Sequence, residues 1–391
     1  MLVYGAGLAQ GLALVSFPAA SSILTSPTGY DLSTTQYGLM FVPQVLLAIT
    51  AAALSPVWAR RRSLQRVLQA GLAANFLAMI LLVASQVFSA SAAAYPILLC
   101  ATAALGFGFG STVPALNTFA ARLDPARQDR SVLTLNALLG TGTALAPLLI
   151  AVFLALGAWW LLPMVAAVGL AGFVAAALRV PLDAGPAAAR GGPARRAALP
   201  RRFFFYAGAV LLYGVCETLF GNWSSVYLTG ERALSAAVAS LALAAFWACV
   251  TIGRVIVAAL TSRVAPGVVY LTLPILIAAA NVAVALAGNP ITAVLAYAAA
   301  GFACSAMLPL SLSLAGEEFP RLGATSSGEL IAGYQVGYGI TAFGVAQLQG
   351  ITGIGLSGIY LAGAGVAVGL AIIARMVVRP VARHPAAPAT G

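Results

Sequence analysis

Long apolar segments follow one another along almost the whole chain, separated by short polar or Pro/Gly-containing stretches. A transmembrane helix needs about 20 mostly apolar residues. A transmembrane β-strand would instead show about 10 residues of alternating polarity. The pattern predicts an all-α membrane protein with twelve transmembrane helices over Leu2–Thr25, Gln36–Ala59, Arg66–Phe88, Ala93–Arg122, Ser131–Leu156, Ala158–Val180, Phe203–Leu228, Ser235–Ser262, Gly267–Gly288, Ile291–Ala315, Thr325–Gln349 and Ile354–Val378.

The composition also indicates that lipid is the solvent. Hydrophobic residues make up 61% of the chain and charged residues 7%, whereas about a quarter of a soluble protein is charged. This excludes a soluble enzyme, a secreted disulfide-bonded domain and a disordered chain. The four cysteines lie in apolar segments without CxxC spacing and are expected to be small buried side chains. The single histidine, His384, rules out a multi-histidine metal centre, and we expect no metal and no cofactor.

The net charge of +11 comes from arginines alone, since the chain has no lysine. All but Arg232 and Arg254 belong to one set of alternating connections and termini. Cytoplasmic loops are enriched in Lys and Arg, so this placement predicts a protein of the cytoplasmic (inner) membrane with both termini in the cytoplasm. The arginines form short clusters between apolar runs, not a stripe along one helix, and no nucleic-acid partner is expected.

The longest connection divides the chain. Residues 181–202 are rich in Pro, Gly, Ala and Arg and are typical of a flexible basic linker that can lie on anionic lipid headgroups. The sequence therefore predicts an N-terminal six-helix bundle over 1–180, a C-terminal six-helix bundle over 203–379 and a cytoplasmic tail over 380–391.

The two predicted bundles repeat one another. GFGFGSTVP at 106–114 is similar to GFACSAMLP at 301–309, with Gly, Phe and Pro at one constant offset, and Pro125 matches Pro320 at the same offset. Two pseudo-symmetric six-helix units with a cytoplasmic linker are typical of transporters, in which the halves rock about a site near the membrane midplane.

These features together resemble the major facilitator superfamily over essentially the whole chain. The family's Gly-x-Leu-x-Asp-Arg-x-Gly-Arg loop signature appears as AALSP at 52–56 followed by three arginines at 60–62, and its repeat as Gly253-Arg254 followed by AALTSR at 258–263. Asp is absent from both copies, so the usual cytoplasmic latch is not implied. GTALAP at 142–147 is a degraded form of the efflux-type Gly-Pro motif.

The seventh predicted helix resembles the fucose-permease-like branch of that family. There an acidic residue precedes a Trp and a Tyr-Leu end, which correspond here to Glu217, Trp223 and Tyr227-Leu228. Members of the branch that couple sugar uptake to protons carry acids in helices 1 and 4, and the corresponding predicted helices here have none.

Glu217 is the deepest acidic residue in the predicted spans. It follows Phe203 by fourteen residues, which is roughly 21 Å of helical rise. Tyr213, Glu217 and Ser224 share one helix face. A charge within a membrane costs about 2.5–3.5 kcal/mol and suggests a function. The family resemblance implies that helices 1, 4, 7 and 10 line a central cavity, so we expect Glu217 to meet substrate and exchange a proton. The alternative is a carboxyl that only joins two helices.

Arg254 and Glu329 are the other ionisable residues expected inside the membrane. Arg254 lies close to the cytoplasmic end of its helix, and Glu329 lies about one turn into helix 11 from the same side. Depth therefore favours Glu329 over Glu217 as the partner of Arg254, and we predict a cytoplasmic gate ion pair. Substrate contact by Arg254, or snorkelling to the interface, are the alternatives.

The remaining candidates are uncharged. They describe a cavity with amides, hydroxyls and aromatic surfaces, suited to a sugar-like or small amphipathic solute better than to a dianion, although each single residue can also bond between helices. They are Tyr213, Asn222, Trp223, Trp247, Gln10, Gln44, Asn136, Ser305, Tyr334, Gln335 and Tyr338.

The sequence thus predicts a secondary transporter that works by alternating access and uses Glu217 for proton symport. It has no nucleotide-binding motif, so a gradient must drive it. We expect a monomer whose partners are a small solute, protons and lipids, and we do not expect an enzyme. The alternatives are a drug or metabolite exporter and, with less support, a membrane sensor or assembly factor that does not transport.

Overall fold

The described part of the chain is built from helices and contains no strand. The computed structural model describes residues 1–124, 127–182, 199–320, 322 and 324–378. The helices before residue 182 are α1 (Leu2–Ala19), α2 (Ser21–Leu24), α3 (Thr34–Leu39), α4 (Phe41–Arg61), α5 (Leu64–Val87), α6 (Ala94–Leu123), α7 (Gln128–Ala155) and α8 (Leu161–Arg179). Those after residue 199 are α9 (Phe203–Val226), the π-helical turn η2 (Tyr227–Glu231), α10 (Ala236–Leu260), α11 (Pro266–Leu286), α12 (Pro290–Cys304), α13 (Met307–Glu318), α14 (Ala324–Thr352) and α15 (Leu356–Val378).

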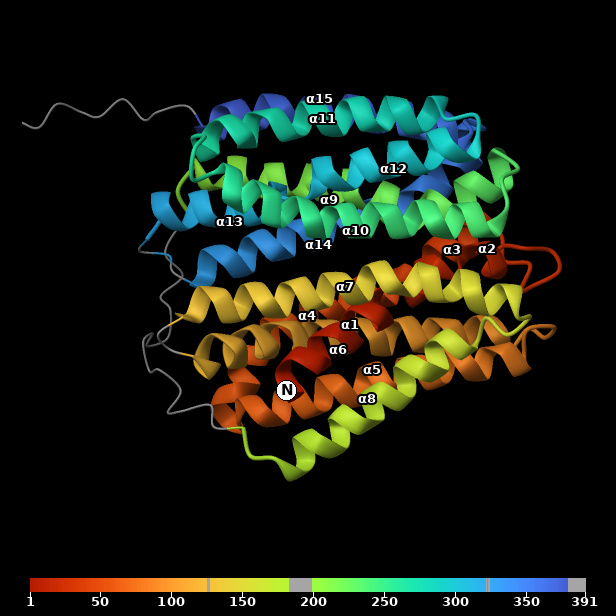
Figure 1. Cartoon of the computed structure of the whole chain (residues 1–391), viewed down its shortest axis with the longest axis horizontal. Helices are drawn as coiled ribbons and strands as arrows, with labels where there is room; N and C mark the ends of the chain where they lie inside the picture. The colour runs from red at the N-terminus through yellow and green to blue at the C-terminus, as the bar shows by residue number, and fades with distance from the viewer. Residues whose placement is uncertain (125–126, 183–198, 321, 323, 379–391) are drawn as a thin grey trace, which may run out of the picture.

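The helices run along the long axis of the molecule, and the two groups lie one above the other (Figure 1). Eleven described segments are long and apolar enough to cross a membrane, and α14 adds a helix of 29 residues. Each of the twelve predicted segments coincides with one of these. The predicted all-α membrane fold is therefore confirmed.

Two predicted segments are divided by prolines. A proline lacks the N–H of a helical residue, and its ring displaces the carbonyl four residues earlier. Pro43 acts in this way on Leu39, and α3 ends there before α4 begins at Phe41. Pro309 acts on Ser305, and α12 ends at Cys304 before α13 begins at Met307. The transmembrane segments predicted over Gln36–Ala59 and Ile291–Ala315 are therefore each interrupted once, and the segment over Leu2–Thr25 is interrupted between α1 and α2.

Helix packing puts some segments at the centre and others at the rim. In the first group α1 packs against α7, α4 against α6, and α5 against α6 and α8; in the second, α9 packs against α14 and α15, α10 against α12, and α11 against α12 and α15. Within an 18-residue window of each span, 78% of the residues are buried in Leu2–Leu24 and only 28% in Leu356–Val378, so α1 is central and α15 peripheral. The groups meet where α4 packs against α14 and α7 against α10.

The repeated glycines occupy equivalent contacts in the two groups. A Cβ atom on Gly106 would lie 2.7 Å from the backbone C and Cα of Gln44 in α4. A Cβ atom on Gly301 would lie 2.8 Å from the backbone C of Phe246 in α10. In both cases only a hydrogen on the glycine allows the backbones to approach, as is common between membrane helices.

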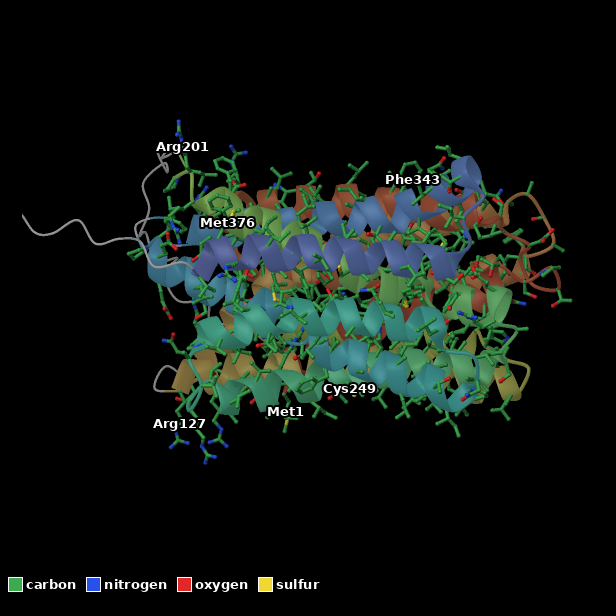
Figure 2. All side chains as sticks on the ribbon, turned by 90° about the horizontal axis from the view of Figure 1, so that it is seen from above. Met1, Arg127, Arg201, Cys249, Phe343 and Met376 are labelled. Carbon is green, nitrogen blue, oxygen red and sulfur yellow. The ribbon has the colours of Figure 1, made fainter. Side chains whose placement is uncertain are left out.

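Arginines gather at one end of the bundle. Arg61 and Arg179 end their helices, Arg122 lies in the last turn of α6, and Figure 2 shows Arg127 and Arg201 at the same end. Most of the predicted linker, residues 183–198, and the predicted tail, residues 380–391, lie outside the described residues.

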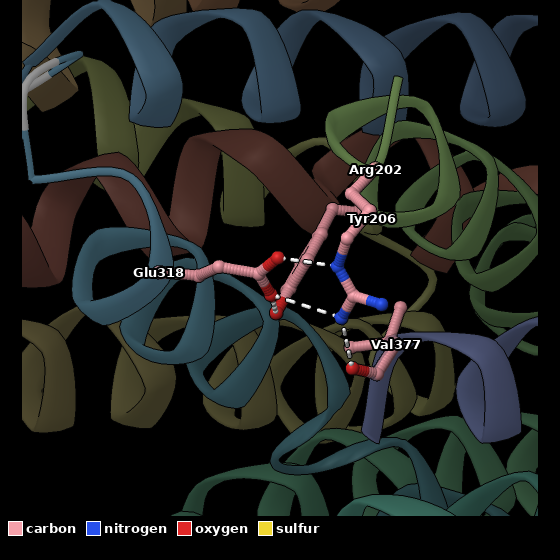
Figure 3. Close-up of polar contacts among 4 residues, drawn as sticks. All are labelled: Arg202, Tyr206, Glu318 and Val377. Carbon is pink, nitrogen blue, oxygen red and sulfur yellow. Dashed lines mark hydrogen bonds and ion pairs between the residues drawn. The ribbon is translucent and has the colours of Figure 1, made fainter. Parts of the chain in front are cut away.

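An ion pair ties three helices together at this arginine-rich end (Figure 3). Arg202 Nε donates to Glu318 Oε1 at 2.5 Å and its Nη2 donates to Oε2 at 3.2 Å and to the Val377 carbonyl at 3.0 Å. The Tyr206 hydroxyl donates to Glu318 Oε2 at 2.7 Å. The fork geometry of a guanidinium suits such a two-oxygen contact. The start of α9 is therefore held against the ends of α13 and α15.

We expect Arg202→Gln to lower the free energy of unfolding by about 1–2 kcal/mol, because Glu318 is only 24% exposed and would lose a charged donor. Thermal unfolding followed by tryptophan fluorescence in detergent measures the change. Arg201→Gln is the matched control, since Arg201 is exposed. Equal stability of the two variants would show that the ion pair contributes nothing measurable.

Candidate functional site

The interruption between α12 and α13 leaves two backbone carbonyls without helical partners. Pro309 has no N–H to offer Ser305, and the helix also stops short of bonding Cys304. Side chains from two other helices take their place. The Tyr213 hydroxyl of α9 donates to the Cys304 carbonyl at 2.9 Å, and Arg254 Nε of α10 donates to the Ser305 carbonyl at 3.3 Å. The break is thus held by residues outside its own helix.

Glu217 lies beside this break and is only 4% exposed. The Tyr213 hydroxyl lies 2.8 Å from Glu217 Oε1, one helical turn away on the same face of α9, as the spacing predicted. The Tyr334 hydroxyl of α14 donates to Glu217 Oε2 at 2.5 Å. Both carboxyl oxygens therefore bond to tyrosines. The guanidinium of Arg254 is near enough to interact electrostatically with the carboxyl.

A second set of hydrogen bonds lies one helical turn from this carboxyl, towards the first group of helices. Tyr338 lies one turn beyond Tyr334 on α14, and its hydroxyl accepts from Asn222 Nδ2 at 2.9 Å. It also accepts from Gln44 Nε2 at 3.4 Å, and Gln44 belongs to α4. A row of polar side chains therefore connects Glu217 with the other group of helices through α14.

Aromatic side chains close the end of this row. The rings of Tyr37 and Trp223 meet edge to face at 5.4 Å, and those of Phe41 and Tyr338 at 6.5 Å. The Tyr37 hydroxyl donates to the Asn222 carbonyl at 2.8 Å, and Trp223 Nε1 donates to the Thr341 carbonyl at 3.1 Å. These contacts join α3 and α4 to α9 and α14. All lie on the side of Glu217 away from the arginine-rich end.

Several polar atoms around the row are buried and have no hydrogen-bond partner among the described residues. They are Gln44 Oε1, Ser224 Oγ, Trp247 Nε1 and Ser305 Oγ. Trp247 borders the Glu217 helix, since a Cβ on Gly221 would lie 3.1 Å from its ring. Buried polar groups are nearly always paired. These unpaired donors and acceptors are therefore exceptions among the paired tyrosines and amides of the site.

The structure does not bring all predicted residues together. Gln10 accepts from Asn75 Nδ2 at 2.6 Å in a separate contact between α1 and α5. Asn136 donates to Asn117 Oδ1 at 3.1 Å between α7 and α6. Gln335 is half-buried and takes no part in the row. In this structure Gln10 and Asn136 each bond to a neighbouring helix, which is the alternative role of such an amide.

Arg254 and Glu329 do not form the predicted ion pair in this conformation. Glu329 is exposed, and Arg254 Nε contacts Ser305. Depth along each helix suggested Glu329, but the interrupted α12 offers Arg254 an unpaired carbonyl beside Glu217. The pair as a gate in another conformation stays a prediction.

Sequence reasoning missed Tyr37, Phe41, Asn75 and the Cys304 carbonyl. Pro309 was the available signal for the carbonyl, because a proline inside an apolar segment marks a carbonyl four residues earlier that needs another donor. Tyr37 and Phe41 carried no such signal, because their contacts are with Trp223 and Tyr338, which belong to other helices.

Comparison with known proteins identifies the fold. The Major Facilitator Superfamily model matches residues 3–342. A crystal structure of the nucleoside transporter NupG is 14% identical, covers 97% of this chain and 99% of its own, and has a TM-score of 0.76. A crystal structure of a single-residue variant of the E. coli fucose:proton symporter FucP is 18% identical over 97% and 98%, with a TM-score of 0.64.

A third similar structure is a POT family transporter in complex with a thioalcohol-conjugated peptide. It is 11% identical, covers 95% of this chain and 94% of its own, and has a TM-score of 0.73. No curated protein sequence matches the chain. At these identities the structures show a shared fold and no more.

Proposed function

Because the chain belongs to the Major Facilitator Superfamily, as the match over residues 3–342 shows, we propose that it moves a small hydroxyl-bearing organic solute by alternating access and carries a proton on Glu217. Membership makes it a multi-pass membrane transporter, not an enzyme. The observation that carries the proposal is the buried Glu217 carboxyl, bonded to Tyr334, at one end of a row of polar side chains in which Tyr338, one turn further along α14, bonds to the other group of helices.

The chemistry of the site supports an uncharged polar solute. Apart from Glu217 and Arg254, the side chains of the row are tyrosines, amides and indoles, which bond hydroxyl groups and stack on sugar or base rings. The unpaired Trp247 Nε1 and Gln44 Oε1 offer one donor and one acceptor to such a solute. NupG is a nucleoside transporter and FucP a fucose:proton symporter. A nucleoside and fucose both contain a hydroxylated sugar ring.

The hydrogen bonds and ring contacts between the two groups of helices support a conformation open towards the arginine-rich end. The described ring contacts and hydrogen bonds between the groups, from Tyr37 to Gln44, lie beyond Glu217 on the opposite side. In the proposal, bundles 1–180 and 203–379 rock about this site, and residues 181–202 join them. The arginine-rich end and both termini face the cytoplasm across the inner membrane, following the positive-inside rule. The transporter acts as a monomer.

An exporter of drugs or metabolites is the second candidate. The Gly142 to Pro147 segment supports it, because Gly142 lies against the α1 backbone, with the Leu12 nitrogen 2.9 Å from where a Cβ would be. This is a close helix contact at the degraded efflux-type motif. Retention of radiolabelled solute in cells with and without the protein separates the two directions.

We expect fucose, a nucleoside such as uridine, or a polyol to raise the thermal unfolding temperature of the purified protein. A ligand at a hundred times its Kd adds about 2.7 kcal/mol to the free energy of unfolding. The screen also includes dicarboxylates and amphipathic amines. Asn222→Ala should reduce the stabilisation because it removes a donor from the row. Asn136→Ala, which is outside the row, is the matched control and should keep it.

Stabilisation by amphipathic amines alone would favour the exporter. Stabilisation by dicarboxylates alone, or by no solute at all, would contradict the proposed substrate class.

A further inference from the structure

Tyr213 stands between the buried carboxyl and the interrupted helix, and we propose that it couples the protonation of Glu217 to the α12–α13 break. When Glu217 is protonated, Tyr213 bonds to the Cys304 carbonyl; when Glu217 is ionised, Tyr213 turns its proton to the carboxylate and releases that carbonyl. The inference rests on the proposed function insofar as Glu217 is the proton-carrying group. Tyr213 is a positioning residue in this scheme.

The two distances at Tyr213 are the first support. Its hydroxyl oxygen lies 2.8 Å from Glu217 Oε1 and 2.9 Å from the Cys304 carbonyl oxygen. A phenol has one proton to donate, whereas a carboxylate and a carbonyl can only accept. Both short contacts are hydrogen bonds at once only when Glu217 carries a proton and donates it to Tyr213. The Tyr334 bond to Glu217 Oε2 is compatible with this arrangement.

Loss of the Glu217 proton changes the preference of Tyr213. A hydrogen bond to an ionised acceptor is about twice as strong as one to a neutral acceptor, so the phenol proton turns to the carboxylate. In this step the Glu217 carboxyl releases one proton to water, and the Tyr213 hydroxyl keeps its own proton. The Cys304 carbonyl then faces an oxygen lone pair at hydrogen-bond distance, which is unfavourable.

The surroundings leave Tyr213 as the group that passes this change to α12. Five groups from four helices face Glu217. They are Tyr213 from its own helix, Tyr334 and Tyr338 from α14, the Cys304 thiol from α12 and Arg254 from α10. Arg254 is the permanent charge in this set, and its Nε is bonded to the Ser305 carbonyl. Tyr334 touches the carboxyl but no carbonyl of the break.

The break is a place where a lost hydrogen bond can move a helix. Pro309 has already removed a helical donor there, so the joint between α12 and α13 is held by Tyr213 and Arg254. Beyond it, the twelve residues of α13 lead to Glu318, which pairs with Arg202 at the arginine-rich end. Release of Cys304 therefore loosens a helix that spans from the site to that end.

Infrared spectroscopy of the whole protein tests this directly. Cys100→Ala, Cys216→Ala and Cys249→Ala leave Cys304 as the only cysteine, and heavy-carbon labelling of the cysteine carbonyl gives that single carbonyl its own band. A pH titration follows this band together with the stretch of the protonated Glu217 carboxyl, which Glu217→Gln identifies. We expect both bands to change with one common midpoint.

Two tyrosine variants separate coupling from structure. In Tyr213→Phe the carboxyl band should still titrate while the pH-dependent shift of the Cys304 band is lost. Tyr334→Phe is the matched control, since it removes the other tyrosine from Glu217 but leaves Cys304 bonded, and here both bands should still move together. If Tyr213→Phe does not fold, the titration of the protein that keeps Tyr213 decides the question. The coupling is then overturned if the Cys304 band does not change with the carboxyl band.

The outcomes are distinguishable. A carboxyl band that titrates with no change at Cys304, or an unaltered Cys304 shift in Tyr213→Phe, overturns the coupling and leaves the proposed function in place. A carboxyl band that does not titrate in the folded protein overturns both the coupling and the proton-carrying role of Glu217.

Discussion

Glu217→Gln is expected to abolish accumulation of solute against its gradient while counterflow, the exchange of labelled for unlabelled solute, continues. Glutamine keeps the shape and the Tyr334 bond acceptor but cannot gain or lose a proton. A membrane potential of roughly 100 mV supplies ~2.3 kcal/mol per charge, which corresponds to about 50-fold accumulation of a neutral solute moved with one proton. The variant should reach about equal concentrations on both sides.

The measurement uses proteoliposomes with an imposed proton gradient and radiolabelled fucose and uridine as the first probes. Glu317→Gln is the matched control, because it makes the same chemical change at an exposed carboxylate and should leave accumulation unchanged. Full accumulation by Glu217→Gln would show that the proton travels by another group, and loss of counterflow as well would place Glu217 in solute binding.

Gly301→Ala is expected to destabilise the protein severely. The added Cβ would lie on the carbonyl of Phe246, 2.8 Å from its backbone C and 3.0 Å from its Cα. Because backbone cannot rotate away as a side chain can, α12 and α10 must separate. Overpacking of this kind costs about 1–3 kcal/mol, and occasionally more. Gly106→Ala should show the same loss, because Gln44 occupies the equivalent place in the other group of helices.

Thermal unfolding and the fraction of monodisperse protein after size-exclusion chromatography measure this effect. Gly365→Ala is the control, since a Cβ there meets nothing within 4 Å, and replacing a helical glycine at such a position raises stability by about 0.4–1 kcal/mol. Wild-type stability of Gly301→Ala would mean that α10 and α12 are not in close backbone contact.

The apolar segments could be predicted because membrane helices have to be long and apolar. The shared face of Tyr213 and Glu217 could be predicted because a helical spacing of four is local. The groups that contact that face could not be predicted. Tyr334 and the Cys304 carbonyl come from helices whose positions depend on packing, and periodicity says which residues lie on one face without saying which helix lies opposite it.

The gate prediction illustrates the same limit. Depth estimated by counting residues from the helix end favoured Glu329 for Arg254, yet the structure places Arg254 at Ser305. A long side chain reaches over more than one turn, and the Pro309 interruption provides an acceptor that residue counting does not include. Gln10 was also predicted to line the cavity, but it lies against Asn75 because α1 packs beside α5 at that point.

The two groups of helices carry a proline at the same offset, and the structure around it differs. Pro114 lies within the unbroken α6, where the neutral Ser55 hydroxyl lies 3.4 Å from the Gly110 carbonyl. At Pro309 the helix is broken and its carbonyls are held by an arginine and a tyrosine that touches a carboxyl. In the proposed coupling, a proline at one repeated offset therefore lies beside a passive support in the first group of helices and a charge-responsive joint in the second.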